Sequence, residues 1–350
     1  MNLAWAGFLL GCGFGMAARA GRFCLLRGLR QRFAGDRSAP ALRAFALALA
    51  TAIATTQLLV GIGEIDVSRA VLLRTEFAGG GMLLGGVLFG LGMSLARTCG
   101  ARALVLLGGG NLRALVVLAG LGLAAQASLT GVLAPLRKLM QFGQVSIDTA
   151  SLPGFLGSLG VPPEFALLLG AGMPVMLLLI FALRGGLLRH APGEAAMAVV
   201  IGLLVTLGWW ITTHVGVDEF DPLPPTSLSF IAPVAESLLY LQLAVGREFS
   251  VGPAIVLGTL AGAGVTALAS RSFQLEGFPA PQDLLTCFAG GLLMGFGGVL
   301  AVGCSIGQGL SGLSTLALAS MPACFGILIG AGIGLAAKNI LQGSNTNETS

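Results

Sequence analysis

The chain has 350 residues, of which 55% are hydrophobic and 10% charged, and its formal net charge is +4. Soluble domains carry charged side chains at about a quarter of their positions, so this composition excludes a soluble globular protein. It predicts an all-α polytopic membrane protein, because a helix satisfies its own backbone hydrogen bonds in lipid. We attribute the positive excess to membrane topology and predict no nucleic-acid partner.

Nine apolar segments are each long enough to cross the ~30 Å of bilayer hydrocarbon as a helix. They cover residues 3–18, 44–62, 80–97, 112–134, 164–183, 195–213, 250–269, 284–303 and 314–337. The first segment is not followed by a small-residue cleavage site and a polar chain, so we expect a retained helix and not a signal peptide. The polar ending "GSNTNETS" predicts a disordered tail.

The basic residues predict an orientation, since loops rich in Lys and Arg stay on the cytoplasmic side. With the N-terminus outside, fourteen of the nineteen basic residues fall on the inner side and ten of the fifteen acidic residues on the outer side. The outer acidic residues include the cluster "VDEFD" at 217–221. We therefore predict an external N-terminus and a cytoplasmic C-terminus.

The sequence repeats internally within one membrane domain. "GGVLFGLGMSLARTC" (85–99) aligns without a gap on "GGLLMGFGGVLAVGC" (290–304). Chance similarity between Gly-rich membrane helices is the alternative, but the copies belong to the third and eighth spans and so run in opposite directions. This is the arrangement of inverted-repeat transporters with broken helices near the midplane. We predict a first half at 1–140, a connecting segment with span five at 141–190, an inverted second half at 191–340 and a polar tail at 341–350.

Glycine runs follow the cysteine of each copy, as "LGGGNL" after Cys99 and "GQGLSG" after Cys304. Unpaired backbone in hydrocarbon is costly, so short re-entrant or broken helices must line a cavity or be buried in protein. Close helix packing explains most of the 55 glycines. For the glycines at 108–110 we instead predict a break, with Asn111 as the N-cap of the next helix. That helix end would point into the interior and attract anions.

The six cysteines include no C-x-x-C pair and no Cys/His cluster, so the sequence predicts no metal site and no cofactor. The closest two in sequence, Cys12 and Cys24, leave a thiol–disulfide relay as a minor alternative. A lone cysteine in a membrane helix is usually a small apolar packing residue. We interpret three cysteines within smooth apolar runs in this way: Cys12, Cys287 and Cys324.

The other three cysteines differ in their surroundings. Cys99 and Cys304 adjoin the glycine breaks of the two repeat copies, which favours a functional role. Cys24 lies between Arg22 and Arg27 at the end of the first span, where structural and functional interpretations are equally supported.

Three segments resemble the signature segments of the YeeE/YedE sulfur-transport family: "RFCLLRGLR", "LARTCGARALVLLGGGNLRALV" and "LAVGCSIGQGLSGLSTLALAS". The resemblance covers essentially the whole chain, and G-C-x-I-G-Q-G-L is its most specific part. It implies a bacterial inner-membrane protein, not an enzyme, that takes up thiosulfate through an hourglass-shaped path. Cys24, Cys99 and Cys304 would each contact the ion. Thr98 replaces the glycine expected before the second cysteine, and we expect it to narrow or polarise the path.

The resemblance also implies partners besides the lipid bilayer and thiosulfate. Some relatives carry a small sulfur-carrier domain, which this sequence lacks, so a separate cytoplasmic carrier protein is expected. Neutral thiols are weak donors that suit a dianion in transit, because weak sequential sites allow both entry and exit. Backbone N–H groups with Asn111, Gln308 and Ser311 would meet the oxygens. Arg102 is either an electrostatic attractant on the inner side or a positive-inside anchor.

Coupling and substrate stay open at this stage. Moving a dianion inward against an inside-negative potential costs about 4.6 kcal/mol per 100 mV. No acidic residue lies well inside a predicted span, so a proton-relay symporter is not favoured. Rapid consumption of the ion inside the cell is an alternative driving force for its uptake. Alternative functions are transport of another sulfur or selenium oxyanion and membrane thiol–disulfide exchange. The redox function predicts two cysteines close enough to bridge, whereas transport predicts separate thiols along a pore.

Overall fold

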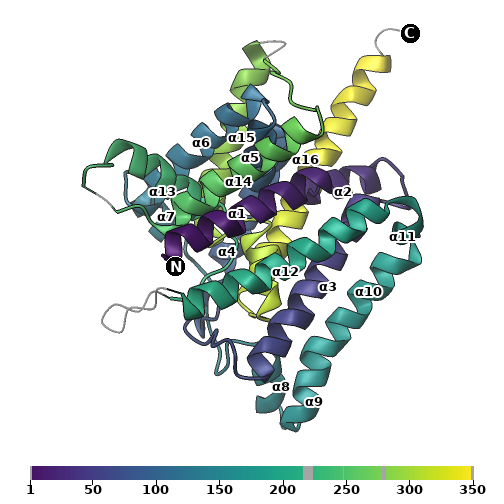
Figure 1. Ribbon diagram of the computed structural model, residues 1–350, viewed down its shortest axis with the longest axis vertical. Helices are drawn as coiled ribbons and strands as arrows, with labels where there is room; N and C mark the ends of the chain where they lie inside the picture. Colours follow the sequence, from purple (N-terminus) through teal and green to yellow (C-terminus); the bar gives the residue numbers. More distant parts are fainter. Residues whose placement is uncertain (1, 216–223, 247, 278–280, 348–350) are drawn as a thin grey trace.

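The computed structural model describes residues 2–215, 224–246, 248–277 and 281–347 (Figure 1). Within these ranges nine helices are long and apolar enough to cross a membrane: Leu3–Phe33, Pro40–Gly61, Gly79–Gly108, Leu112–Leu129, Glu164–Arg184, Pro192–His214, Val251–Ala269, Gln282–Leu300 and Ser320–Ala337. Each predicted apolar segment overlaps one of them, which confirms the all-α polytopic fold. The acidic cluster predicted at 217–221 lies outside the described residues.

The helical elements follow in chain order. Residues 1–140 contain α1 (Leu3–Ala20), α2 (Leu25–Phe33), α3 (Pro40–Gly61), α4 (Gly79–Ala96), α5 (Gly100–Gly108), α6 (Leu112–Leu129) and α7 (Ala134–Leu139). Residues 141–190 contain α8 (Leu152–Ser158), α9 (Pro163–Leu167), the π-helical η1 (Leu168–Gly172), α10 (Met173–Arg184) and α11 (Leu187–His190). The later residues contain α12 (Pro192–His214), α13 (Ile231–Gln242), α14 (Val251–Ala269), α15 (Pro281–Leu300), the π-helical η2 (Gly307–Gly312) and α16 (Ser320–Asn347). The division into two repeat halves stays a prediction.

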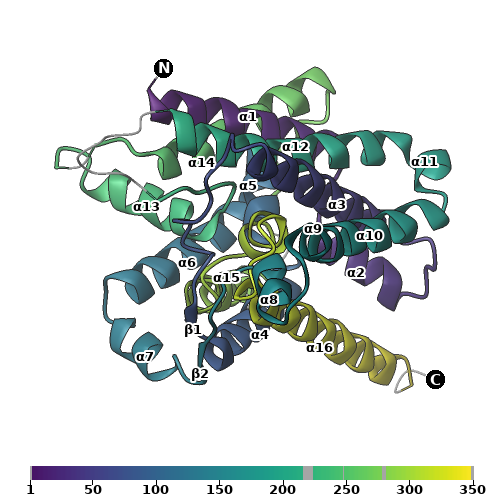
Figure 2. The ribbon, with the colours of Figure 1, turned by 90° about the horizontal axis from the view of Figure 1, so that it is seen from below.

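The last span begins and ends at other residues than the sequence predicted. The ninth helix begins at Ser320 and not at 314, because the preceding glycine-rich stretch forms η2 and a series of turns. The backbone of α16 stays helical as far as Asn347, into the segment predicted to be a disordered tail. Both views show this helix projecting from the body of the molecule toward the C-terminus (Figures 1 and 2).

The helices that carry the two repeat copies, α4 and α15, pack backbone against backbone. A Cβ added at Gly85 would lie 2.7 Å from the carbonyl oxygen of Gly297, and one added at Gly297 would lie 2.6 Å from that of Gly85. Gly92 and Gly290 make the same reciprocal approach, at 2.6 and 2.8 Å. Only glycine permits such distances, so these positions are fixed by close helix packing.

Other helices flank this pair. α16 packs on α4, α6 packs on α15, α1 packs along α14, and α12 packs on α3. α10 lies at the edge of the molecule beside α3 (Figure 1). Only 22% of the span that contains α10 is buried in the protein, against 39–56% for the other spans described. Span five is therefore a peripheral helix with most of its apolar surface facing lipid.

Contacts near the ends of the spans agree with spans that alternate in direction. Arg19, at the end of α1, donates to the Ser272 carbonyl, which follows α14, at 3.0 Å. Arg27 of α2 pairs with Glu194, at the start of α12, at 2.8 Å. Loops after even-numbered spans meet in an antiparallel pair of strands, β1 (Glu76–Ala78) and β2 (Gln144–Ser146). Which of the two groups of loops faces the cytoplasm stays a prediction.

Candidate functional site

The chain breaks in the same way before each of the three cysteines predicted to be functional. Cys24, Cys99 and Cys304 each lie two residues after a non-glycine residue in the left-handed region. These residues are Arg22, Arg97 and Val302, with φ of 46°, 58° and 58°. A left-handed non-glycine residue costs about 1–2 kcal/mol, and such strain gathers at functional sites. Three further non-glycine residues of the described chain, Ala39, Arg271 and Leu316, are also left-handed, so the break is a feature that these cysteine turns share and becomes informative only together with their cavities.

Two of the three cysteines begin a helix. Cys24 is the N-cap residue of α2 and Cys99 is the N-cap residue of α5, each with extended backbone. The first N–H groups of a helix have no partner within it and carry the positive end of its dipole. Both thiols therefore lie beside helix ends that favour negative charge.

Cys24 and Cys99 line one cavity and contact each other through their thiols. The side chains are nearly buried, with 8% and 3% of their surface exposed. The lining comes from several elements: Phe14, Ala18, Phe23, Cys24, Leu25, Cys99, Ala101, Arg102, Val105, Ser305 and Ile306. It is mostly apolar, with the thiols, a guanidinium and the Ser305 side chain as polar groups. We call this the thiol cavity.

Cys304 lies next to the thiol cavity in a turn. Its side chain is 1% exposed, and the Gly307 N–H donates to Cys304 Sγ at 3.3 Å. The two residues that follow it, Ser305 and Ile306, line the thiol cavity. Cys304 and Cys99 are near enough to interact electrostatically. The structure therefore brings all three cysteines to one region.

A second cavity lies beyond this turn, and we call it the vestibule. Its lining is Val71, Leu72, Arg74, Phe77, Ala78, Met82, Gln141, Leu300, Val302, Gln308 and Ala319. Val302 lines the vestibule and Ser305 lines the thiol cavity, so Cys304 lies in the chain between residues of the two cavities. The turn at 302–306 therefore separates two hollows.

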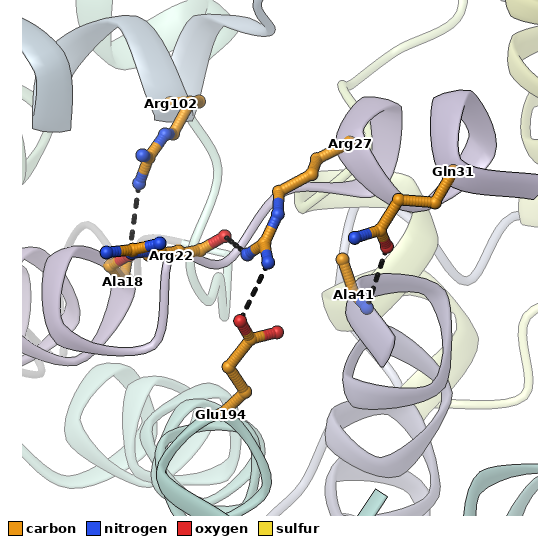
Figure 3. Close-up of polar contacts among 7 residues, drawn as sticks. All are labelled: Ala18, Arg22, Arg27, Gln31, Ala41, Arg102 and Glu194. Carbon is orange, nitrogen blue, oxygen red and sulfur yellow. Dashed lines mark hydrogen bonds and ion pairs between the residues drawn. The ribbon is translucent and has the colours of Figure 1, made fainter. Parts of the chain in front are cut away.

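Arg102 contributes the charged group of the thiol cavity. Its Nη1 donates to the carbonyl of Ala18 at 3.2 Å, which holds the guanidinium beside the end of α1 (Figure 3). Figure 3 also shows Arg22, from the turn before Cys24, and Arg27 of α2, which pairs with Glu194 at 2.8 Å. Among the lining residues, the charged side chain is therefore that of Arg102.

Gln308 and Ser311 are buried but their donors are engaged. Gln308 Nε2 donates to the carbonyls of Ala301, at 2.8 Å, and Val302, at 3.0 Å. Ser311 Oγ donates to the carbonyl of Leu228 at 2.7 Å. Gln308 lines the vestibule, whereas Ser311 lines neither cavity. In this conformation neither side chain has an amide or hydroxyl hydrogen left for an ion.

Asn111 is the N-cap residue of α6, as predicted, but its side chain makes no capping bond. Its amide instead donates to the carboxylate of Glu276, and it lines neither cavity. Gly110, with φ of 96°, turns the chain there, and Leu112 is 41% exposed. The N-terminal end of α6 therefore lies at the surface of the protein. We had predicted that this end would point into the interior.

The remaining cysteines and Thr98 are placed by packing. Cys12, Cys287 and Cys324 lie within α1, α15 and α16 and line neither cavity. Thr98 is 5% exposed, and its hydroxyl donates to the carbonyl of Cys99 at 3.3 Å. It is absent from both linings, so nothing in the structure indicates a narrowing of the path by this residue.

Sequence reasoning missed two side chains of this region. Ser305 lines the thiol cavity, and its place beside Cys304 was a signal that a nearby polar group could share the site. Arg27 bonds the loop before Cys24, which no sequence pattern indicates, because a basic residue after the first span also fits a membrane anchor.

Residues 20–333 match the family model described as sulphur transport. The chain belongs to the sulphur-transport family. Two relatives named thiosulfate transporter TsuA match it over most of its length. The Escherichia coli (strain K12) protein is 27% identical over 88% of this chain and 87% of its own. The Spirochaeta thermophila protein is 26% identical over 94% of this chain and 97% of its own. In this member of the family, the matched region includes all three cysteine turns.

Proposed function

We propose that this chain takes up thiosulfate across the bacterial inner membrane. The ion would pass from the vestibule, through the turn at Cys304, to the thiol cavity lined by Cys24 and Cys99. The observation that carries the proposal is the meeting of three cysteines, each after a left-handed residue, in one region: Cys24 and Cys99 line the thiol cavity, and Cys304 lies in the turn between this cavity and the vestibule. The two relatives named thiosulfate transporters support the choice of substrate.

The groups around the thiols suit a dianion that must also leave. Thiol S–H groups donate weakly, so no single site holds the ion. The helix ends at Cys24 and Cys99 add backbone N–H groups and positive dipole ends. Arg102 adds a full charge at the same cavity, partly satisfied by the Ala18 carbonyl. Attraction is therefore strongest at the thiol cavity and weakest at the neutral Cys304 turn.

Two architectural predictions belong to the same proposal. We propose that the halves at 1–140 and 191–340 are inverted repeats, and the reciprocal glycine contacts between α4 and α15 support this. A two-fold relation that equates Gly85 with Gly290 and Gly92 with Gly297 turns the contact of Gly85 with Gly297 into one of Gly290 with Gly92, and both contacts are present. We also propose an external N-terminus, a cytoplasmic C-terminus and a separate small sulfur-carrier protein as cytoplasmic partner.

Growth on thiosulfate as sole sulfur source tests the function. A bacterial host without its own thiosulfate uptake should grow when it expresses this chain and fail with empty vector. Radiolabelled thiosulfate should accumulate in the same cells, and excess unlabelled selenate or sulfate should compete poorly. Growth without faster uptake, or equal competition by these oxyanions, would contradict the proposed substrate.

The contact between Cys24 and Cys99 favours one rival, a protein that exchanges disulfide equivalents. That function requires the two thiols to cycle through a disulfide in the working protein. Trapping of cellular thiols followed by mass spectrometry separates the two cases. A transporter should keep Cys24 and Cys99 reduced during uptake, whereas the redox rival should show a bridged fraction that changes with the oxidant supply.

The orientation has its own test. A tag at the N-terminus should react with an impermeant probe in intact spheroplasts, and a tag at the C-terminus should react only after lysis. The opposite labelling pattern would reverse the predicted orientation and leave the fold unchanged.

A further inference from the structure

Gln308 bonds the turn that carries Cys304. Its side chain is 0% exposed and lies four residues after the cysteine. Nε2 donates to the carbonyl of Val302, the left-handed residue, and to that of Ala301 before it. A Cβ added at Gly303, where φ is 158°, would lie 2.9 Å from Gln308 Cγ, so the side chain also fills the inside of the turn.

Arg27 bonds the turn that carries Cys24 in a similar way. It lies three residues after the cysteine, and its Nη1 donates to the carbonyl of Arg22, the left-handed residue, at 3.1 Å (Figure 3). Its Nη2 pairs with Glu194 of α12 at 2.8 Å. Both terminal nitrogens of the guanidinium therefore have a partner, and these two bonds fix it against the turn.

The contacts of Gln308 and Arg27 have the same basis: each satisfies the carbonyl of a left-handed residue. A left-handed residue ends a helix and leaves carbonyls that no later N–H of the helix reaches. At Val302 and Arg22, a side chain from the first turn of the next helical segment supplies the missing donor. A donor in this place fixes the carbonyl two residues before the cysteine, in the Val302–Gly303 or the Arg22–Phe23 peptide group, and so restricts the directions in which the chain can carry the thiol.

We propose that Gln308 and Arg27 are positioning residues that hold the thiols of Cys304 and Cys24 toward the substrate path. This inference rests on the proposed transport function, since it assigns the two residues to the same path. It gives Gln308 a role different from ion binding. Its hydrogens are donated to the turn, and its Oε1, which has no partner among the described residues, is an acceptor that a dianion does not seek.

The Cys99 turn offers an internal contrast. Within the described residues, no hydrogen bond from a later side chain to the Arg97 carbonyl is present; Arg102, three residues after Cys99, donates to Ala18 instead. Thr98 bonds the Cys99 carbonyl locally. In the Cys99 turn, the side chain three residues after the cysteine therefore bonds α1 and not the carbonyl of the left-handed residue Arg97.

The first test replaces Gln308 by Met, which keeps the length and removes both donors. Maximal uptake should fall at least about tenfold, and Cys304 should react at least about tenfold faster with N-ethylmaleimide, because the loss of both hydrogen bonds to the turn favours its opening by that factor or more. Gln126→Met is the control, since Gln126 bonds only Thr130 on its own helix. It should leave the uptake rate and the alkylation rate of Cys304 unchanged.

The second test concerns Arg27, and it decides the matter if Gln308→Met fails to accumulate in the membrane. Arg27→Met should speed alkylation of Cys24 and lower maximal uptake, whereas Arg27→Lys, which retains a donor, should restore most of both. Glu194→Gln removes the charge partner of Arg27 but not its bond to the Arg22 carbonyl. It should leave Cys24 alkylation near that of the unmodified protein.

Alkylation is measured without thiosulfate, so it tests the positioning role even if the chain transports another solute. Unchanged alkylation of both cysteines in the Gln308→Met and Arg27→Met proteins would overturn the inference. So would equal effects of Arg27→Lys and Arg27→Met, since a lysine ammonium keeps a donor for the Arg22 carbonyl. Absent thiosulfate uptake by the unmodified protein would instead contradict the proposed function.

Discussion

The turns at Cys99 and Cys304 end the two copies of one repeated sequence, yet they continue differently. Cys99 starts the nine-residue α-helix α5, and Arg102 follows in its first turn. Cys304 is followed by the π-helical η2, where Gly307 stands at the equivalent position and Gln308 is buried. The turn at Cys99 therefore leads into a helix with a charged side chain in its first turn. The turn at Cys304 has no charged side chain at the equivalent position and is held by hydrogen bonds from Gln308. On the proposed path, this difference would place attraction of the ion at the thiol cavity and selection at the turn between the two cavities.

The largest expected effect is at the neutral turn. Cys304→Ala removes the thiol between the two cavities, and we expect thiosulfate-dependent growth to be abolished with the protein still present in the membrane. Cys287→Ala is the matched control, because Cys287 lies within α15 and lines neither cavity. Growth and immunoblotted protein levels of both variants give the result. Equal loss of growth in both would remove the distinction between path and packing cysteines.

Cys304→Ser asks whether any small donor suffices at this turn. A serine hydroxyl is a harder partner than a thiol and bonds nearby backbone readily. Here the Gly307 N–H already points at the side-chain atom of residue 304. We expect uptake by the serine variant to be nearly as low as by the alanine variant, measured at matched expression. Uptake close to that of the unmodified protein would mean that sulfur has no special role there.

Arg102→Gln tests the charged side of the comparison. A charge-assisted contact with an anion is worth more than a neutral one, so we expect the half-saturating thiosulfate concentration to rise about tenfold with a smaller change in maximal rate. Arg113→Gln is the control, because Arg113 lies near the same end of the molecule, donates to the Gly277 carbonyl and lines neither cavity. An unchanged half-saturating concentration in Arg102→Gln would leave Arg102 as a membrane anchor only.

The smallest effect concerns the left-handed residues themselves. Arg97 is exposed and follows α4, where glycine is the favoured residue, so Arg97→Gly should stabilise the detergent-solubilised protein by about 1 kcal/mol. Val302 is partly buried in the vestibule wall, so relief of strain in Val302→Gly is offset by lost packing. Thermal unfolding should show the first gain without the second. A lower unfolding temperature for Arg97→Gly would show that the break is not strained.

Hydropathy predicted the nine spans because length and composition alone decide whether a helix crosses lipid. The division of the cysteines stays a prediction: the three assigned to the path follow breaks and line or adjoin the thiol cavity, but Cys324, assigned to packing, also lies near enough to Cys304 to interact with it electrostatically. The left-handed residues were not predicted, because Arg and Val carry no signal for that conformation. The contact of Asn111 depends on Glu276, 165 residues later, which one sequence does not reveal. The bonds of Gln308 are local, but they depend on the left-handed turn at Val302, which was not predicted.

The glycine crossing of α4 and α15 limits how this protein can move. At the Gly85–Gly297 and Gly92–Gly290 contacts, the backbones of the two helices approach so closely that a side chain at any of these four positions would clash. Rocking one half against the other would have to separate these backbones inside the bilayer. We expect α4 and α15 to keep the same relative position during transport. The solute would then advance through small rearrangements of the turns beside them.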